Sequence, residues 1–167
     1  MELKEAEILC RSLMARHGLF KHGYDFKWNS RYNGFGFHNG RKRIISLSRR
    51  LVALNNEEEV KDTILHEIAH ALDFIRNGFQ YRYSNYKRMI HDDTWKAICE
   101  EIGCKPRRCY TSKEVVSPKR PNKYKLIHLP TEKVVKYSKR KPKYFGSPWI
   151  EALVDGVRGR CEWRKME

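Results

Sequence analysis

Hydrophobic side chains recur at spacings of three and four between residues 55 and 78, which is the repeat of an amphipathic α-helix. The stripe consists of Val60, Ile64, Ile68, Leu72 and Ile75, with Leu65 and Ala69 beside it. Asn56 and Glu59 have the spacing of a capping box, and Asn77-Gly78 is a typical left-handed helix end. The pattern therefore predicts a long helix with one face in the protein core.

Two other helices are predicted from the same periodicity. An apolar face and Gly18 shortly after it predict a helix over residues 2–17. Asp92 or Asp93 can cap a later helix that ends at Gly103. The apolar side of that helix consists of Trp95, Ile98, Cys99 and Ile102. His91 therefore stands at its entrance.

Short aromatic or β-branched runs before the long helix predict strands. They lie at residues 24–28, 34–38 and 42–47, and Asn39-Gly40 has the sequence of a tight hairpin turn. We expect a three-stranded antiparallel sheet, followed by a short turn of helix over residues 48–54. Together with the helices, this sheet predicts an α+β fold.

Length and composition are typical of one ordinary domain with an appendage. The chain has 167 residues, of which 40% are hydrophobic, and no apolar run approaches 18 residues. The acidic, helical N-terminus does not have the pattern of a signal peptide. Five cysteines without CxxC spacing favour reduced thiols over a disulfide framework. We therefore expect a soluble intracellular protein with no membrane partner.

Positive charge is concentrated in the second part of the chain. Residues 1–100 carry 17 Lys/Arg and 13 Asp/Glu, whereas residues 101–167 carry 18 and 7. Between residues 105 and 143 there are 14 basic and two acidic residues, interspersed with Tyr110, Tyr124 and Tyr137. Phosphates are bound by Lys and Arg and bases stack on aromatic rings, so this composition favours a nucleic-acid partner over a plain charged surface or an anionic protein partner.

The long helix carries the sequence His66-Glu67-Ile68-Ala69-His70. Residues four apart lie on one side of a helix, so the two imidazoles could bind one metal ion. Glu67 points about 100° away from His66, which suits a general base that reaches a metal-activated water better than a third ligand. A Zn²⁺ ion with three protein ligands keeps an open position for that water.

A catalytic zinc site of this kind needs one more ligand than the helix supplies. His91 is the candidate, although a histidine at a helix start is more often a surface or capping residue. The other histidines are less suited by position, since three precede the motif helix and one lies in the basic tail: His17, His22, His38 and His128. Asp73, on the face of His70, could orient a ligating imidazole.

Several of these segments together resemble the SprT-like metallopeptidases, which include the Spartan proteases of DNA–protein crosslinks. The resemblance spans about residues 5–110. Its matching segments are Trp28 with the hairpin after it, the strand 43–48, the motif segment 59–71, His91 four residues before Trp95, and residues 106–110. In the family the third histidine usually sits in Gly-His-Gly, whereas here Ile90 and Asp92 flank it. Many members also carry a four-cysteine zinc ribbon, which this chain lacks.

The resemblance implies a compact zincin-like (minigluzincin) fold with one Zn²⁺ on His66, His70 and His91, and with Glu67 as general base. It also implies DNA binding, single-stranded or at single-strand/double-strand junctions, and cleavage of DNA-bound proteins, which is a DNA-repair activity. Such a protein would act as a monomer in the cytoplasm or nucleoid of a prokaryote or virus, or in the nucleus of a eukaryote.

We expect two domains. Residues 1–112 form the peptidase domain, and residues 113–167 a basic extension that resembles a zinc ribbon without its cysteines. Strands at 124–129 and 133–137 would form a β-hairpin, with Trp149 and Trp163 packed to support it. The expected DNA-binding residues are Lys105, Arg107, Arg108, Lys119, Arg120, Lys123, Lys125, Lys136, Lys139, Arg140, Lys141 and Lys143.

The sequence therefore predicts a zinc endopeptidase that binds DNA and cleaves proteins on it. We expect the strand at residues 42–47 to be an edge strand that holds the substrate backbone, and one of Tyr81, Tyr83 or Tyr86 could stabilise the oxyanion. Two alternatives remain: a metallopeptidase that cuts a specific regulator, and a DNA-binding module with a structural zinc site. Glu67 argues against the second alternative, because a closed structural site does not use a carboxylate beside a water position.

Overall fold

The computed structural model describes residues 1–78, 82–84, 87–107 and 115–166. The chain divides into two compact units, Met1–Pro118 and Lys119–Glu167. Both contain β-structure, and the first also contains the helices, so the fold is α+β as expected. None of the helices in the described residues is long and apolar enough to cross a membrane.

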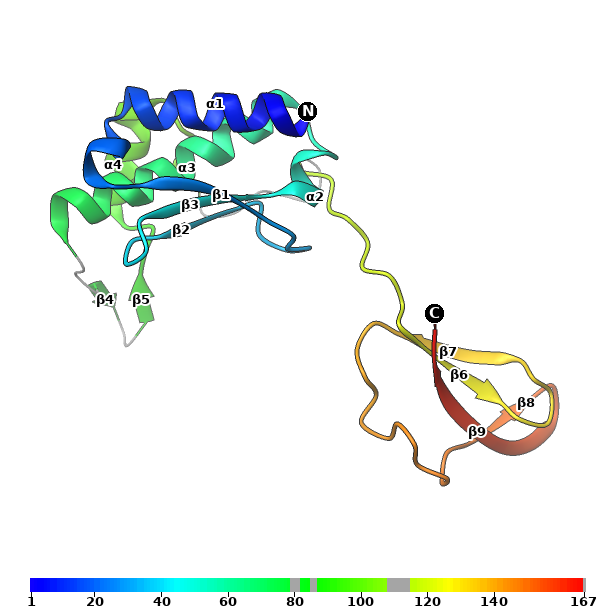
Figure 1. Ribbon diagram of the computed structural model, residues 1–167. Coiled ribbons are helices and arrows are strands. Elements are labelled where there is room, and N and C mark those ends of the chain that lie inside the picture. Colours follow the sequence, from blue (N-terminus) through cyan, green and yellow to red (C-terminus); the bar gives the residue numbers. More distant parts are fainter. Residues whose placement is uncertain (79–81, 85–86, 108–114, 167) are drawn as a thin grey trace. The chain divides into compact units, whose positions relative to one another are not determined.

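The first unit consists of helices packed on a small sheet (Figure 1). Its elements are α1 (Leu3–Arg16), the 3₁₀ helix η1 (Leu19–His22), β1 (Asp25–Asn29), β2 (Gly36–Asn39), β3 (Ile44–Ser48), α2 (Arg49–Val52), α3 (Glu57–Asn77), β4 (Arg82–Ser84), β5 (Lys87–Met89) and α4 (Asp93–Ile102). The three helices and three strands that the sequence predicts are all present. A short hairpin formed by β4 and β5 lies between α3 and α4, where the sequence analysis predicted no strand.

The sheet is mixed, which corrects the expectation of an antiparallel one. The strand order is β1-β3-β2, with β3 parallel to β1 and antiparallel to β2. The loop of residues 30–35 is long enough that β2 does not have to pair with β1. β3 lies between these two strands and pairs with both. β3 takes the central place because Ile45 and Leu47 are fully buried on one face while Ser46 and Ser48 are buried on the other.

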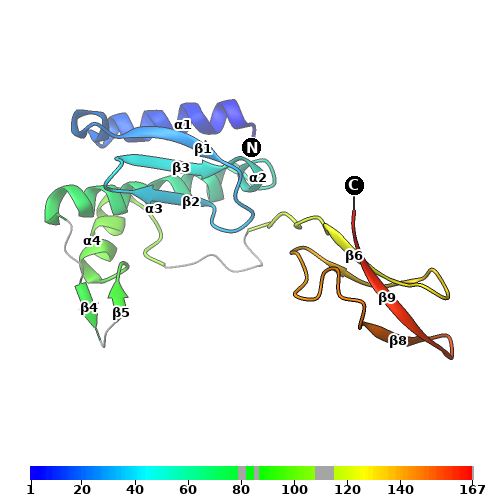
Figure 2. The ribbon, with the colours of Figure 1, turned by 60° about the horizontal axis from the view of Figure 1, so that its bottom comes forward.

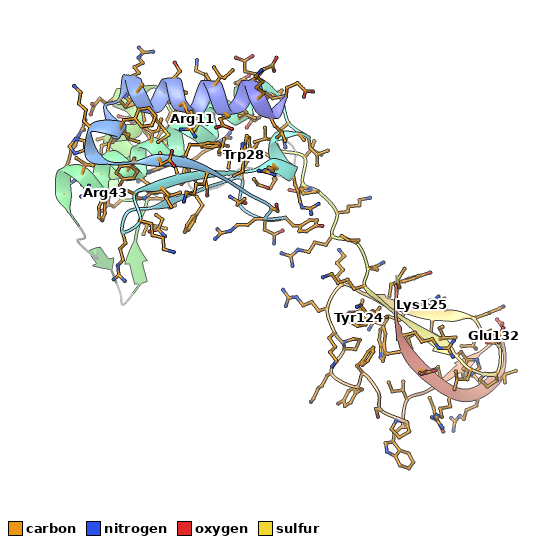
Figure 3. The ribbon with its side chains drawn as sticks, viewed as in Figure 1. Arg11, Trp28, Arg43, Tyr124, Lys125 and Glu132 are labelled. Carbon is orange, nitrogen blue, oxygen red and sulfur yellow. The ribbon has the colours of Figure 1, made fainter. Side chains whose placement is uncertain are left out.

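Helices α1 and α3 cover one face of this sheet, with α3 alongside β2 and α1 alongside β1 (Figure 2). The core contains large side chains from all of these elements, including Met14, Leu19, Ile64, Ile68 and Trp95. On α1, Glu7 accepts hydrogen bonds from Trp28 Nε1 at 2.9 Å and from Arg11 at 3.0 Å (Figure 3). These contacts fix β1 beneath α1.

Helix α3 begins and ends where the sequence predicts. The Asn56 side chain accepts a hydrogen bond from the Glu59 backbone N–H at 2.9 Å. Gly78 ends the helix with a φ of 68°, but its ψ of −164° lies outside the left-handed helical region that we expected. Asp92 caps α4 in the same way as Asn56 caps α3, and Gly103 ends α4 in the left-handed conformation.

The first unit extends to Pro118, beyond residue 112, because the chain returns to it after α4. The Asn55 side chain pairs with the Val116 backbone like another peptide group, donating at 2.9 Å and accepting at 2.7 Å. Val115 is also buried in the core of this unit. These contacts would be lost in a chain cut before residue 113.

The second unit is a four-stranded antiparallel sheet rather than a single hairpin. Its strands are β6 (Tyr124–His128), β7 (Val134–Ser138), β8 (Glu151–Val154) and β9 (Val157–Lys165), in the order β7-β6-β9-β8. The predicted hairpin of β6 and β7 is present, and Glu132 lies in its turn (Figure 3). Trp163 pairs opposite Leu126 and is half-buried, but Trp149 is 88% exposed, so its predicted packing role is wrong.

Candidate metal centre and peptidase site

The metal centre begins with two histidines on α3. The ring centroids of His66 and His70 are 4.9 Å apart, which places both imidazoles on one side of the helix. Burial lowers the pKa of His66 to about 4, with a smaller contribution from His91. At neutral pH the His66 ring is therefore uncharged, the form in which imidazole binds a metal.

His91 completes the group from the residue before the N-cap of α4. Its Nε2 atom lies 3.1 Å from His70 Nε2 and 3.3 Å from His66 Nε2. The ligand atoms of the three histidines all lie within 4.8 Å of one another, so the cluster could hold a metal ion. Nitrogen ligands at 2.0–2.1 Å from a tetrahedral zinc are about 3.3 Å apart, and the two observed separations are close to this value.

Trp95 forms a common wall for the three imidazoles. Its ring centroid lies 4.8 Å from that of His66, 5.2 Å from that of His70 and 4.5 Å from that of His91. The indole is fully buried and lies one helical turn after His91. The sequence predicts its place on the apolar side of the helix but not its contact with the histidines. The spacing of four residues between His91 and Trp95 is the sequence feature that could have indicated this contact.

Glu67 turns away from the histidines toward the edge strand β2. It is only 7% exposed, and burial raises the pKa of its carboxyl to about 8, while a hydrogen bond from the His38 backbone lowers it. Gly36 on β2 makes room for this side chain. A Cβ atom at Gly36 would lie 2.6 Å from both Cγ and Oε1 of Glu67, closer than such atoms approach in real structures.

This close approach predicts that Gly36→Ala displaces the Glu67 carboxyl. Gly36 does not have a positive φ, so alanine introduces no backbone strain there and its effect comes from the contact with Glu67. With Glu67 as the general base that the sequence predicts, kcat for peptide hydrolysis should fall by about 100-fold, since general-base catalysis contributes about 10² to 10⁴ and requires a correctly placed base. Zinc content should stay the same. A steady-state kinetic assay measures this, with Ser30→Ala in the exposed loop as the control.

His38 is a further residue near the centre that sequence reasoning did not select. Its Nε2 atom lies 3.0 Å from the Tyr24 hydroxyl, and its ring stacks on His70 with a centroid distance of 6.2 Å. Burial lowers the pKa of His38 to about 4, against a smaller opposing effect of Asp73. His38 is therefore neutral and packs behind a ligand candidate. The order of residues along the chain gave no signal for this contact.

Asp73 lies one turn after His70, as the helical spacing requires. Its carboxylate accepts a hydrogen bond from Asn77 at 2.8 Å, and its charge acts on His38. The expected role of Asp73 in orienting a ligating imidazole stays a prediction. Of the tyrosines considered for the oxyanion, Tyr81 and Tyr86 lie outside the described residues, and Tyr83 is described only as part of the β4 backbone.

The edge strand beside the centre is β2, which corrects the choice of residues 42–47. Those residues form most of β3, and β3 lies between β1 and β2. The turn from β2 to β3 also differs from the tight turn expected at Asn39-Gly40, because Asn39 pairs with Ile44 and leaves residues 40–43 in the loop. Among the described strands, the sheet edge next to Glu67 is consequently formed by Gly36–Asn39.

The basic residues expected to bind DNA fall into two groups. Lys105 pairs with Glu58 at 3.2 Å, and Arg107 lies 3.9 Å from both Glu59 and Asp62, so carboxylates of α3 already balance these two charges. Arg108 lies outside the described residues. The remaining nine are in the second unit, where all but the half-buried Lys125 are exposed: Lys119, Arg120, Lys123, Lys125, Lys136, Lys139, Arg140, Lys141 and Lys143.

The SprT-like family model matches residues 12–115, which include every residue of the centre. The match covers more than half of the chain, and the chain therefore belongs to the SprT-like family. Its first unit is a metallopeptidase-like domain with a histidine cluster that could hold the metal. Neither a curated protein nor a solved structure shows significant similarity to this chain.

Proposed function

We propose that this protein is a zinc-dependent endopeptidase that binds DNA and cleaves proteins associated with it. The observation that carries the peptidase assignment is the convergence of His66, His70 and His91, with the buried Glu67 carboxyl on the next residue of the same helix. Three imidazole nitrogens are the ligand set of catalytic zinc rather than of calcium or magnesium, which prefer oxygen ligands. We propose one zinc ion per chain.

The chemistry follows from the positions of the side chains. A bound Zn²⁺ would polarise the scissile carbonyl and lower the pKa of a water molecule at the site. Glu67 would accept a proton from that water on its carboxylate and then donate it to the amine that leaves. Burial raises the pKa of this carboxyl and so makes its carboxylate a stronger base, and the positive charge of a bound Zn²⁺ would favour the ionised form that accepts the proton.

The substrate backbone would add to the free edge of β2. Extended peptides bind exposed sheet edges through main-chain hydrogen bonds, and β2 is the edge strand that contacts Glu67. A peptide in this position would run past Glu67, which provides the orientation that hydrolysis needs. This supports cleavage inside an extended segment of a protein.

The second unit supports a nucleic-acid partner. It contains 14 Lys/Arg and five Asp/Glu, and several of its aromatic rings are exposed, including Tyr137, Tyr144 and Trp149. Lys141 and Lys143 lie 5.2 and 5.4 Å from the ring centroids of Phe145 and Tyr144. Cations and open ring faces are the combination that binds single strands. The strand β9 adds cations that the sequence prediction omitted: Arg158, Arg160, Arg164 and Lys165.

The function is tested with purified full-length protein and a basic protein bound to DNA. We expect cleavage to increase when single-stranded DNA is added, and metal analysis to give one zinc ion per chain. Equal cleavage with and without DNA would favour a peptidase for a specific regulator. DNA binding and bound zinc without any cleavage would favour a DNA-binding module with a structural site. We further propose that the protein acts as a monomer inside the cell. Size-exclusion chromatography with light scattering measures the oligomeric state.

A further inference from the structure

The positive charge of the first unit is concentrated in one segment. Residues 1–118 carry 21 Lys/Arg and 15 Asp/Glu, while residues 26–56 carry seven basic residues and no acidic one. The rest of the unit is therefore close to neutral, with 14 basic and 15 acidic residues. All seven cations of the segment are exposed: Lys27, Arg31, Arg41, Lys42, Arg43, Arg49 and Arg50. This segment forms the sheet, its two loops and α2.

Part of this charge lies on the face of the sheet away from α1 and α3. Side chains alternate along a strand, and Gly36 faces Glu67, so Phe37 faces the opposite way. Phe37, Ser46 and Lys27 form one row across β2, β3 and β1 on that side. None of the helices in the described part of the chain covers this face (Figure 1). We name it the open sheet face.

Two arginines stack on aromatic rings at the open sheet face and the loop beside it. The guanidinium carbon of Arg31 lies 4.3 Å from the Phe37 ring centroid, and that of Arg50 lies 4.3 Å from the Tyr32 ring centroid. The loop is held down by a 2.6 Å hydrogen bond from the Ser48 hydroxyl to the Arg31 carbonyl. Phe37 remains 38% exposed under its arginine. The stacks therefore have a fixed base and an exposed outer surface.

Three cations of the open sheet face and the loop beside it have no carboxylate partner in the described part of the chain. They are Lys27, Arg31 and Arg50, whereas cations of other segments, such as Arg11, Arg76 and Lys105, do form ion pairs. Arg50 instead donates to the Ser30 carbonyl at 3.2 Å, which orients the guanidinium without neutralising it. The positive potential of the open sheet face is thus not compensated locally, as a surface for a polyanion requires.

We propose that the open sheet face, with Lys27, Arg31, Phe37, Tyr32 and Arg50, is a binding site for single-stranded nucleic acid. The cations bind phosphates, and the flat arginine stacks provide planes for bases. An acidic peptide would use the charges but would leave these planes without a matching group, so nucleic acid fits the surface better. The proposal rests on the DNA binding proposed above and places an additional contact in the peptidase unit.

This site lies on the same strand as the peptidase site but on the opposite face. Phe37 is placed between Gly36, which faces Glu67, and His38, whose backbone bonds to Glu67. A nucleic acid bound to Phe37 would therefore contact β2, the same strand to which the substrate peptide would add. Cleavage would be directed to proteins that are themselves on that nucleic acid.

The test uses the full chain and a labelled oligothymidine. We expect Arg31→Gln with Arg50→Gln to weaken binding by roughly ten-fold and to lower the salt slope by about 1.4, since each phosphate contact on a single strand contributes about 0.7. The control is Lys4→Gln with Arg16→Gln, which removes two exposed cations of α1 and should leave both values unchanged. Arg31→Lys with Arg50→Lys should keep the slope and weaken binding, because lysine keeps the charge but not the plane.

The outcomes separate this site from the function proposed for the whole chain. If the unmodified chain binds no oligothymidine, the DNA-binding function itself is wrong. If the unmodified chain binds, and if Arg31→Gln with Arg50→Gln binds as tightly as the control Lys4→Gln with Arg16→Gln, only the open sheet face is excluded as a binding site. If an acidic peptide displaced the labelled oligothymidine more strongly than unlabelled oligothymidine of equal charge, nucleic acid would be the wrong choice of ligand for this site. Melting temperatures measured by circular dichroism establish that each variant is folded.

Discussion

Replacing Glu67 with glutamine is expected to lower peptidase activity by a factor of about 100 or more, with zinc content and melting temperature unchanged. Glutamine has the size of glutamate but cannot take a proton from water at neutral pH. The side chain is buried and carries a raised pKa, so a neutral amide fits its surroundings. Its oxygen can still accept the hydrogen bond from the His38 backbone. The variant therefore isolates proton transfer from folding and metal binding.

The measurement is kcat/KM on a peptide substrate, accompanied by metal analysis. Glu100→Gln is a matched control, because Glu100 is an exposed glutamate of α4 and lies outside the site. Combining Glu67→Gln with Gly36→Ala gives a stricter test. If Gly36 acts through Glu67, the double variant is no slower than Glu67→Gln alone, since effects on one catalytic group are not additive. Wild-type activity of Glu67→Gln would disprove the proposed base.

Local sequence determined the parts of the fold that depend on neighbours along the chain. Asn56 and Asp92 cap α3 and α4 because the side-chain oxygen of each accepts a hydrogen bond from a backbone N–H three residues later in the first turn of the helix. This contact is local and does not depend on the rest of the fold. His66 and His70 share a face because the helix repeat requires it. These two candidate ligands were predictable for this reason, whereas His91 was selected because a catalytic zinc site needs a third ligand and because the family resemblance implies it.

The order of strands was not predictable in this way. The runs of residues that form β1, β2 and β3 are visible in the sequence, but the pairing of β1 with β3 depends on which strand can be buried on both faces. Contacts that cross between elements escaped prediction for the same reason. Gly36 against Glu67 and Trp95 against the histidines join residues that are far apart along the chain or that lie on different elements.

The turn between β8 and β9 in the second unit has a sequence signature that the strand predictions did not include. Val154 pairs with Val157, and Asp155 and Gly156 between them both have positive φ, at 51° and 79°. An Asp-Gly pair between apolar residues is typical of such a two-residue turn. Reading it would have predicted β8 and β9. Trp149 lies outside these strands, and its exposure could not be inferred from hydrophobicity alone.

Replacing His91 with alanine is expected to weaken zinc binding by at least about 100-fold. Loss of a residue that only supports a metal ligand costs about 10 to 100-fold in affinity, so loss of a direct ligand costs at least the upper value. His66 and His70 would remain on α3, but two imidazoles leave the ion one protein ligand short of a catalytic site. Competition with a metal chelator of known affinity measures the change. Activity at limiting zinc should fall in parallel.

Two other histidines provide the controls for this variant. His22 is exposed on η1, and His22→Ala should bind zinc like the unmodified protein. His128 is fully buried in the second unit, with its Nδ1 atom 2.7 Å from the Thr131 hydroxyl, so His128→Ala should destabilise that sheet and leave zinc affinity unchanged. If zinc is lost in His128→Ala and retained in His91→Ala, the third ligand has been assigned to the wrong residue. Because a nitrogen of His91 lies within 3.3 Å of those of His66 and His70, we expect the opposite result.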